Sequence, residues 1–167
     1  QVLDQLAPDH RAALLRLSYL PNVPESLAVA LTGYEKALHL LDELYRRHLF
    51  TDRRSGIETT YQFHALFHAF LQHHAKKSLS QVEQVLAQQQ AGQLLEQSGQ
   101  AEAALVLYSA LQDWGAIARI VRQQAKLWIA QGRWRVAVEW IEQLPSQEIS
   151  DDCWLQYWLG SAQIGVS

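Results

Sequence analysis

Apolar residues recur every three to four positions through the first part of the chain, which is the spacing of one face of a helix. The pattern predicts a helix over 8–20, a short second helix over 24–31 and a third helix over 35–48. Pro24 suits the first turn of the second helix, because an amide there needs no partner inside the helix. Gly33 then fits a helix stop, since glycine readily adopts the left-handed conformation found at such ends.

After the third helix the pattern changes to β-branched and aromatic residues. Segments 49–52 and 59–63 flank a charged, glycine-containing turn at 53–56, and together they predict a β-hairpin. A strongly apolar helix follows over 65–77. The fold class is therefore mostly α: three helices, a small hairpin and a fourth helix predict a winged-helix domain, which we place at residues 1–78.

The rest of the chain, 79–167, predicts TPR-like α-α hairpin repeats. Ser80 and Glu83 have the spacing of a capping box at the start of a long helix. A pattern of leucine, glycine and alanine then recurs at an offset of about 33 residues, close to the length of a tetratricopeptide repeat. The matched positions are Leu94, Gly99, Ala104 and Leu111 with Leu127, Gly132, Ala137 and Leu144. Asp113 is expected to begin the second hairpin, Pro145 to end it, and Asp151-Asp152 to begin a third.

Six tryptophans lie in the repeat region, and most are expected to be apolar contacts between stacked helices. They are Trp114, Trp128, Trp134, Trp140, Trp154 and Trp158. Trp134 follows a predicted turn, so we expect it to be exposed and to mark a possible surface for a ligand or partner.

Composition and charge narrow the classes of function. Hydrophobic residues make up 49% and charged residues 19% of the chain, which excludes a disordered tail. The net charge of −3 argues against a nucleic-acid partner, because such domains usually carry a basic excess. The predicted third helix would also present three carboxylates to a phosphate backbone. Its expected solvent face comprises Glu35, Lys36, His39, Asp42, Glu43, Arg46 and Arg47, with Arg53 and Arg54 in the turn beyond it.

The low cysteine content and the absence of long apolar runs indicate the cellular setting. A single cysteine, Cys153, permits no disulfide framework and suggests a reducing compartment, which we take to be the cytoplasm. No apolar run reaches the length of a membrane helix, so no membrane contact is expected. The chain has no methionine and stops soon after an aromatic-rich helix. We therefore expect it to be part of a longer protein.

No catalytic or metal-binding motif is found. There is no phosphate-binding loop, no nucleophile elbow, and no histidine spaced from Cys153 as a catalytic partner. His64 and His68 stand four residues apart, as zinc ligands on a helix do, but Ala65 replaces the general-base glutamate of such sites. We expect no metal and no enzymatic activity. His68, His73 and His74 are expected to be packed and hydrogen-bonded at the edge of the winged-helix core.

The order of several segments resembles one family. It is the signal-transducing (STAND) ATPases of the maltose-regulon-activator, or MalT-like, type, which end in a LuxR-type DNA-binding domain. The segments are LLRLSYL at 14–20, LAVALTG at 27–33, LDEL at 41–44, LF at 49–50, YQFHALF at 61–67, FL at 70–71, GRW at 132–134 and EQLP at 142–145.

The resemblance implies a role for one histidine. In such proteins an upstream ATPase core holds ADP, or ATP with Mg, and a Met-His-Asp motif on the winged-helix side contacts the β-phosphate of ADP. The resemblance implies that His64 is the nucleotide-sensing residue, although Phe63 and Ala65 replace the Met and Asp of the motif. This fragment itself would hold no cofactor.

The resemblance also implies partners. These are the upstream nucleotide-binding domain of the same chain, and an inducer or regulatory protein on the helical repeats, with 76–80 as the joint between domain and repeats. The sequence thus predicts the regulatory and sensor fragment of an ATP/ADP-switched transcriptional regulator. Two alternatives stay open: a helical scaffold for protein–protein interaction without a nucleotide link, and a winged-helix DNA-binding module.

Overall fold

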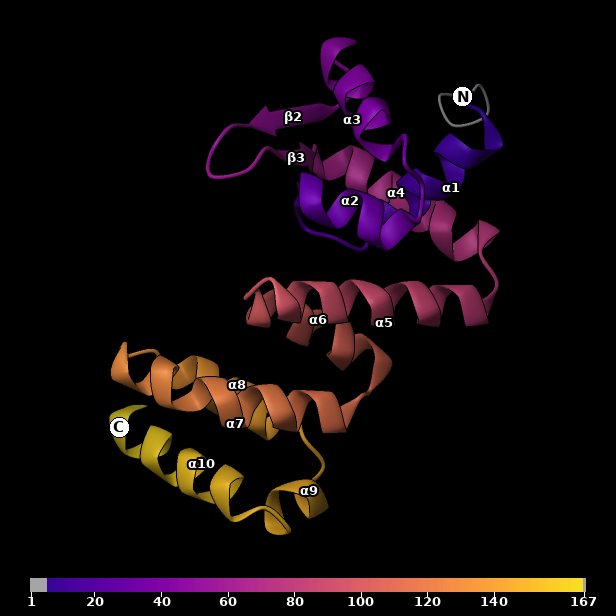
Figure 1. Cartoon of the computed structure of the whole chain (residues 1–167). Coiled ribbons are helices and arrows are strands. Elements are labelled where there is room, and N and C mark those ends of the chain that lie inside the picture. Colours follow the sequence, from indigo (N-terminus) through magenta and orange to yellow (C-terminus); the bar gives the residue numbers. More distant parts are fainter. Residues whose placement is uncertain (1–5, 167) are drawn as a thin grey trace. The chain divides into compact units, whose positions relative to one another are not determined.

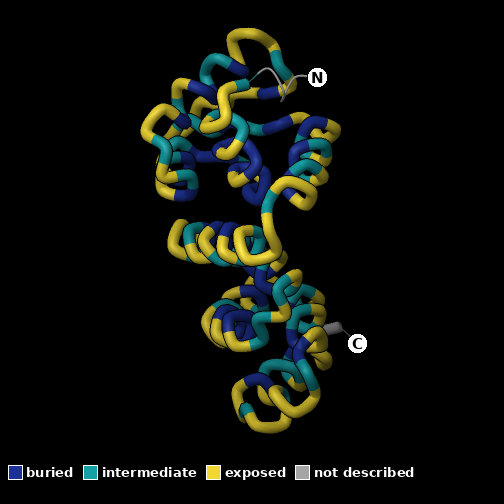
Figure 2. The backbone as a smooth tube through the Cα atoms, turned by 90° about the vertical axis from the view of Figure 1, so that its right-hand side faces the viewer, coloured by how far each residue is buried: buried dark blue, intermediate teal, exposed yellow. Residues whose placement is uncertain are grey.

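The computed structural model of the chain describes residues 6–166 and contains two compact units that divide between residues 97 and 98 (Figure 1). Each unit has buried residues of its own (Figure 2). Among the described residues, no helix combines the length and the apolar character required to cross a bilayer.

The first unit is built from leucine-rich helices. Its helices are α1 (Pro8–Leu17), α2 (Glu25–Thr32), α3 (Ala37–Arg46), α4 (Ala65–Ser78) and α5 (Gln81–Gln97). Helix α1 contacts α2, α3 and α4 and so lies at the centre of the core. The largest side chains that are almost completely buried in the first unit are Leu14, Leu17, Leu20, Leu31, Leu40, Leu41, Leu71 and Leu95. The predicted helices are confirmed, but the first ends at Leu17 rather than at residue 20, and the third spans Ala37–Arg46 rather than 35–48.

A small antiparallel sheet completes the first unit, with strand order β1-β3-β2. The predicted hairpin is formed by β2 (Thr51–Arg54) and β3 (Thr60–Phe63). Strand β1 (Val23–Pro24) was not predicted, because two residues ending in proline have no strand periodicity. Pro24 is not in the first turn of α2 but is its N-cap residue, with extended backbone. The N–H of Glu25 donates to the carbonyl oxygen of Thr59 at 3.0 Å, which continues the pairing beyond β1.

The two arginines expected in the hairpin turn lie in strand β2 instead. Arg53 is paired with Tyr61 and Arg54 with Thr60 in the antiparallel register. The guanidinium of Arg53 lies 3.3 Å from a carboxylate oxygen of Asp42 and 5.9 Å from the ring centroid of Tyr45. Packing of the strand against α3 therefore extends the hairpin by two residues beyond the predicted strand end.

The connection between α4 and α5 carries the predicted capping box. The backbone N–H and the hydroxyl of Ser80 both donate to Glu83 Oε2, at 2.8 and 2.7 Å, and the N–H of Glu83 donates to Ser80 Oγ at 3.3 Å. The side-chain hydrogen bond from Ser80 lowers the pKa of Glu83, as does the backbone one. The amide of Gln84 also donates to the carbonyl oxygens of Lys76 and Leu79, so the expected joint at 76–80 is bridged by hydrogen bonds.

Helix α5 belongs to the compact unit of the winged helix. It packs against α2 and α4, and the division between units falls after it rather than after residue 78. The sequence placed α5 with the repeats because its length and its glycine break match the next hairpin. Helix α5 belongs to the first unit because it packs against α2, a helix that is distant from it in sequence.

The second unit consists of helices alone among the described residues. They are α6 (Ala101–Leu111), α7 (Trp114–Ala130), α8 (Trp134–Glu142), α9 (Ser146–Ser150) and α10 (Cys153–Val166). Helix α7 contacts α6, α8 and α10, and α8 also packs against α10. The predicted start signals are confirmed, because Asp113 Oδ1 accepts the N–H of Ala116 and Asp152 Oδ1 accepts those of Trp154 and Leu155. Helix α9 after Pro145 was not predicted.

The structure follows the expected period of 33 residues closely. Helices α5 and α7 begin at Gln81 and Trp114, and α6 and α8 begin at Ala101 and Trp134. Gly99 and Gly132 both have positive φ, at 78° and 73°. Ala104 and Ala137 are both completely buried.

One pair in the predicted repeat is wrong. Leu127 is 51% exposed and is not a core residue. The buried pair lies one position later, at Leu95 and Trp128, which are 0% and 2% exposed. A one-residue step turns a side chain by about 100° around a helix, so a match of leucines in sequence did not identify the inward face.

Substitution of Gly132 tests the turn between α7 and α8. Because a Cβ there would meet no atom within 4 Å, the cost of Gly132→Ala is conformational and should be about 1 kcal/mol. Gly160 lies inside α10 with equal space around it, so Gly160→Ala should instead stabilise the unit by roughly 0.5–1 kcal/mol. All six tryptophans lie in the second unit, so urea denaturation followed by their fluorescence measures both effects. Equal shifts of the two variants in the same direction would contradict the turn geometry.

Candidate functional site

His64 lies between the end of β3 and the first residue of α4. It is the N-cap residue of α4, with φ −59° and ψ 145°. Its N–H donates to the carbonyl oxygen of Phe50 at 2.8 Å, and its own carbonyl accepts the N–H of His68 at 2.9 Å. The backbone of His64 is therefore held by the segment before β2 on one side and by α4 on the other.

The imidazole of His64 faces solvent and not the core. Its side chain is 50% exposed, and Nε2 lies 3.2 Å from Asp52 Oδ2. The ring meets that of Phe50 edge to face, with 6.3 Å between centroids. Phe50, whose ring meets the imidazole, is itself 50% exposed, and Leu66, the second residue of α4, is 87% exposed. The expectation that this ring can face a docked neighbour is consistent with the geometry, and its role as nucleotide sensor stays a prediction.

Asp52 was not identified from the sequence as part of this site. It stands opposite Gln62 in the hairpin register, two residues before His64. The proximity of Asp52 to His64 can be inferred only once the strand register is known, because the two residues are twelve positions apart along the chain.

The other histidines of α4 do not gather around His64. His68 is half-buried, and its Nε2 is buried without a hydrogen-bond partner, so the expected hydrogen bond is absent there. His73 is exposed, whereas His74 packs on Phe70 with 4.4 Å between ring centroids. Within residues 6–166, no three or more His, Cys, Asp or Glu side chains come together as metal ligands would.

The outer face of α3 carries arginines that are paired within the domain. Arg46 lies 2.8 Å from Asp42, and Arg47 lies 2.8 Å from Glu43. Arg53 of β2 approaches the same Asp42. These pairs neutralise much of the positive charge that a phosphate backbone would need from this helix.

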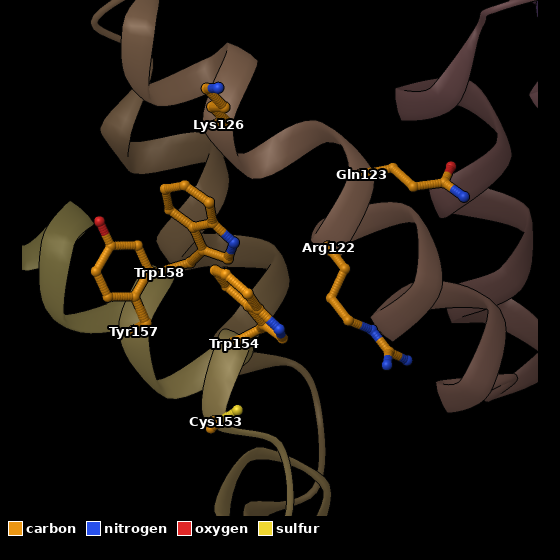
Figure 3. Close-up of a pocket in the computed structure, with 7 residues that line it drawn as sticks. All are labelled: Arg122, Gln123, Lys126, Cys153, Trp154, Tyr157 and Trp158. Atoms are coloured by element: carbon orange, nitrogen blue, oxygen red, sulfur yellow. The ribbon is translucent and has the colours of Figure 1, made fainter.

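The second unit contains an open groove of about 910 Å³ between α7 and α10 (Figure 3). Trp154 and Tyr157 are 58% and 56% exposed, and Trp154 and Trp158 stack with 6.5 Å between centroids. On the opposite side, Arg122 lies 3.2 Å from Asp152. The groove is lined by Arg122, Gln123, Lys126, Cys153, Trp154, Tyr157 and Trp158. It offers aromatic faces together with cationic groups.

Trp134 is not part of this groove. It is the first residue of α8 and is half-buried, because α8 packs against both α7 and α10. The expectation that Trp134 is the exposed tryptophan is wrong, and Trp154 is far more exposed. Arg133, the residue before Trp134, donates a hydrogen bond to Glu102 at 2.6 Å and lowers the pKa of that carboxyl. That Trp134 forms a surface for a ligand or partner stays a prediction.

Taken together, the features of the first unit define a winged-helix domain, and a helical array with a 33-residue period follows it. Residues 1–83 match the family described as the MalT winged helix domain, and this part of the chain belongs to that family.

Relatives extend the likeness over the rest of the chain. The HTH-type transcriptional regulator MalT of Vibrio cholerae is 31% identical over 166 residues, which is 98% of this chain and 18% of that protein. The regulators of the same name from Yersinia pestis and Yersinia pseudotuberculosis are each 39% identical over 80 residues, 48% of this chain and 9% of those proteins. The chain thus spans less than a fifth of these regulators.

Replacing two tryptophans by alanine distinguishes the core of the second unit from the groove. Trp128 is almost completely buried, so Trp128→Ala should lower the free energy of unfolding by about 3–5 kcal/mol. Trp154→Ala removes a largely exposed ring and should cost less than about 1 kcal/mol. Thermal and urea unfolding followed by far-ultraviolet circular dichroism compare the two. A large loss for Trp154→Ala would mean that the α10 aromatic residues are core.

Proposed function

We propose that this chain is the regulatory and sensor part of an ATP/ADP-switched transcriptional regulator that works in the cytoplasm. In this proposal the winged-helix domain binds the resting, ADP-loaded form of an upstream nucleotide-binding domain through His64. The helical array begins the arm that receives an inducer or a regulatory protein. The chain itself catalyses nothing and contacts no nucleic acid.

The observation that carries the proposal is the placement of His64. His64 directly follows a β-strand and occupies the N-cap position of α4 without a side-chain cap hydrogen bond. Its half-exposed imidazole is therefore available to a neighbouring domain. Such a neighbour would also cover the exposed apolar side chains of Phe50, which meets the ring, and of Leu66, two residues further along the chain. A ligand that binds better to one arrangement of two domains shifts their equilibrium toward it, which is the behaviour a switch requires.

The donor groups at this surface suit a contact with ADP but not a complete nucleotide site. His64 offers an imidazole, and the first turn of α4 offers backbone N–H groups at its positive end. The chain has no phosphate-binding loop, so the adenosine, the Mg ion and most of the phosphate contacts would belong to the upstream domain. When bound there, ADP would supply phosphate oxygens that accept hydrogen bonds from His64.

The groove of the second unit supports the sensor half of the proposal. Stacked aromatic rings and nearby cationic side chains provide apolar contact area with polar groups that fix an orientation. An inducer or a regulatory protein would use such a surface.

Removal of the imidazole should weaken retention of ADP. In the complete regulator, His64→Ala should speed ADP release about tenfold or more, since a hydrogen bond to a charged group contributes roughly 1.5–3 kcal/mol net of its exchange with water. Basal transcription should rise. His73→Ala, on the exposed side of the same helix, is the matched control. The measurement is displacement of a fluorescent ADP analogue, and equal release rates in all three proteins would refute the role of His64.

The arginines of α3 and β2 suggest direct DNA binding as an alternative function. Because Arg46, Arg47 and Arg53 are paired with carboxylates, we expect no affinity for duplex DNA stronger than about 10⁻⁴ M at physiological salt. Fluorescence anisotropy with a labelled duplex over a range of salt concentrations checks this. Micromolar affinity with a steep salt dependence would favour the DNA-binding module instead.

A further inference from the structure

We infer that Asp52 is the positioning residue for the nucleotide-sensing His64, supplied across the hairpin by strand β2. The inference rests on the proposed function of His64 and adds a second residue to it. In this inference, Asp52 orients the imidazole of His64 by contact with one ring nitrogen, so that the other ring nitrogen faces a phosphate.

The backbone around Asp52 is arranged for this contact. His48 and Phe50 both have φ of 53°, a left-handed conformation that side-chain-bearing residues rarely adopt. The carbonyl of Phe50 accepts the N–H of His64 at 2.8 Å. Two residues later Asp52 enters the ladder opposite Gln62. An uncommon backbone conformation is therefore maintained immediately before the strand that brings Asp52 to His64.

The geometry of the pair determines which ring nitrogen remains available. Asp52 Oδ2 lies 3.2 Å from His64 Nε2, close enough for the carboxylate to engage a proton on that nitrogen. In a histidine with one nitrogen engaged by a carboxylate, the other nitrogen is the one that can meet a further ligand. Nδ1 is thus the atom of His64 that would donate to a phosphate, and it does so when the ring is protonated at both nitrogens.

Asp52 also supplies an acidic group at a site where the adjacent sequence has none. The residue after His64 is Ala65, and the first turn of α4 contains no acidic side chain. An imidazolium between a carboxylate and a phosphate has both of its N–H groups satisfied. A side chain from another strand therefore provides the partner that the helix does not.

The orientation of His64 can be tested on this chain without nucleotide, by its rate of modification with diethyl pyrocarbonate. Release of Nε2 in Asp52→Ala should raise the rate at His64 about two- to fivefold, the range expected for an exposed charged pair. His73, also on α4 and exposed, is the internal reference within the same molecule. Glu58→Gln removes an acidic group from the same hairpin and should leave the rate at His64 unchanged. Peptide mass spectrometry gives the rate for each histidine.

The second arm measures ADP release from the complete regulator. Asp52→Ala should speed release, Asp52→Glu should restore part of the retention, and Asp52→Ala should have no further effect when His64 is already alanine. That loss of effect shows that Asp52 acts through His64 rather than on its own. Asp52 is largely exposed, so these variants are expected to fold, and circular dichroism verifies it.

The two arms separate failure of this inference from failure of the proposed function. If His64→Ala changes ADP release but Asp52→Ala alters neither release nor modification, Asp52 has no positioning role. If Asp52→Ala alters modification of His64 but no variant changes ADP release, the pair is real and the nucleotide contact is wrong. An equal effect of Asp52→Ala with and without His64 would also overturn the inference.

Discussion

The pairing of β3 with two strands is the constraint on which the first unit depends. Strand β3 lies between β1, which leads into α2, and β2, which follows α3. Its four residues therefore pair with a hairpin neighbour on one side and with a strand distant in sequence on the other. Tyr61 and Phe63 of β3 are buried, and the alternation along the strand leaves Gln62 on the opposite side. His64 follows directly and is carried out of the sheet at the start of α4. Its position is thus fixed by the ladder together with its backbone hydrogen bonds to Phe50 and His68.

The second unit depends on close approach of helices at small residues. Ala104, Ala125 and Ala137 are completely buried, and alanine allows neighbouring helix backbones to come near each other. The turns at Gly99 and Gly132 have left-handed backbones that glycine adopts without strain. Together these features repeat one hairpin geometry at a fixed period, and they leave the aromatic residues of α10 along the groove with α7.

The match of residues 1–83 to the MalT winged helix domain family agrees with the architecture of the first unit. The match identifies the fold of this part of the chain and does not by itself identify a site. The charges on the outer face of α3 argue against a nucleic-acid surface there, because Arg46 and Arg47 already have carboxylate partners. The exposed histidine with apolar neighbours is the feature that a docked domain would cover. The proposed switch joins these observations into one mechanism.

The sequence by itself determined the helices other than α9, the hairpin, the capping box at Ser80 and the repeat period, because each depends on contacts between residues near one another along the chain. It also singled out His64, through a resemblance. Only the tertiary structure decided that Asp52 meets His64, that Val23–Pro24 is a third strand, that α5 joins the first unit, and that Trp154 rather than Trp134 is exposed. These outcomes depend on strand register and on which helix faces meet, and both are set by packing between segments distant in sequence.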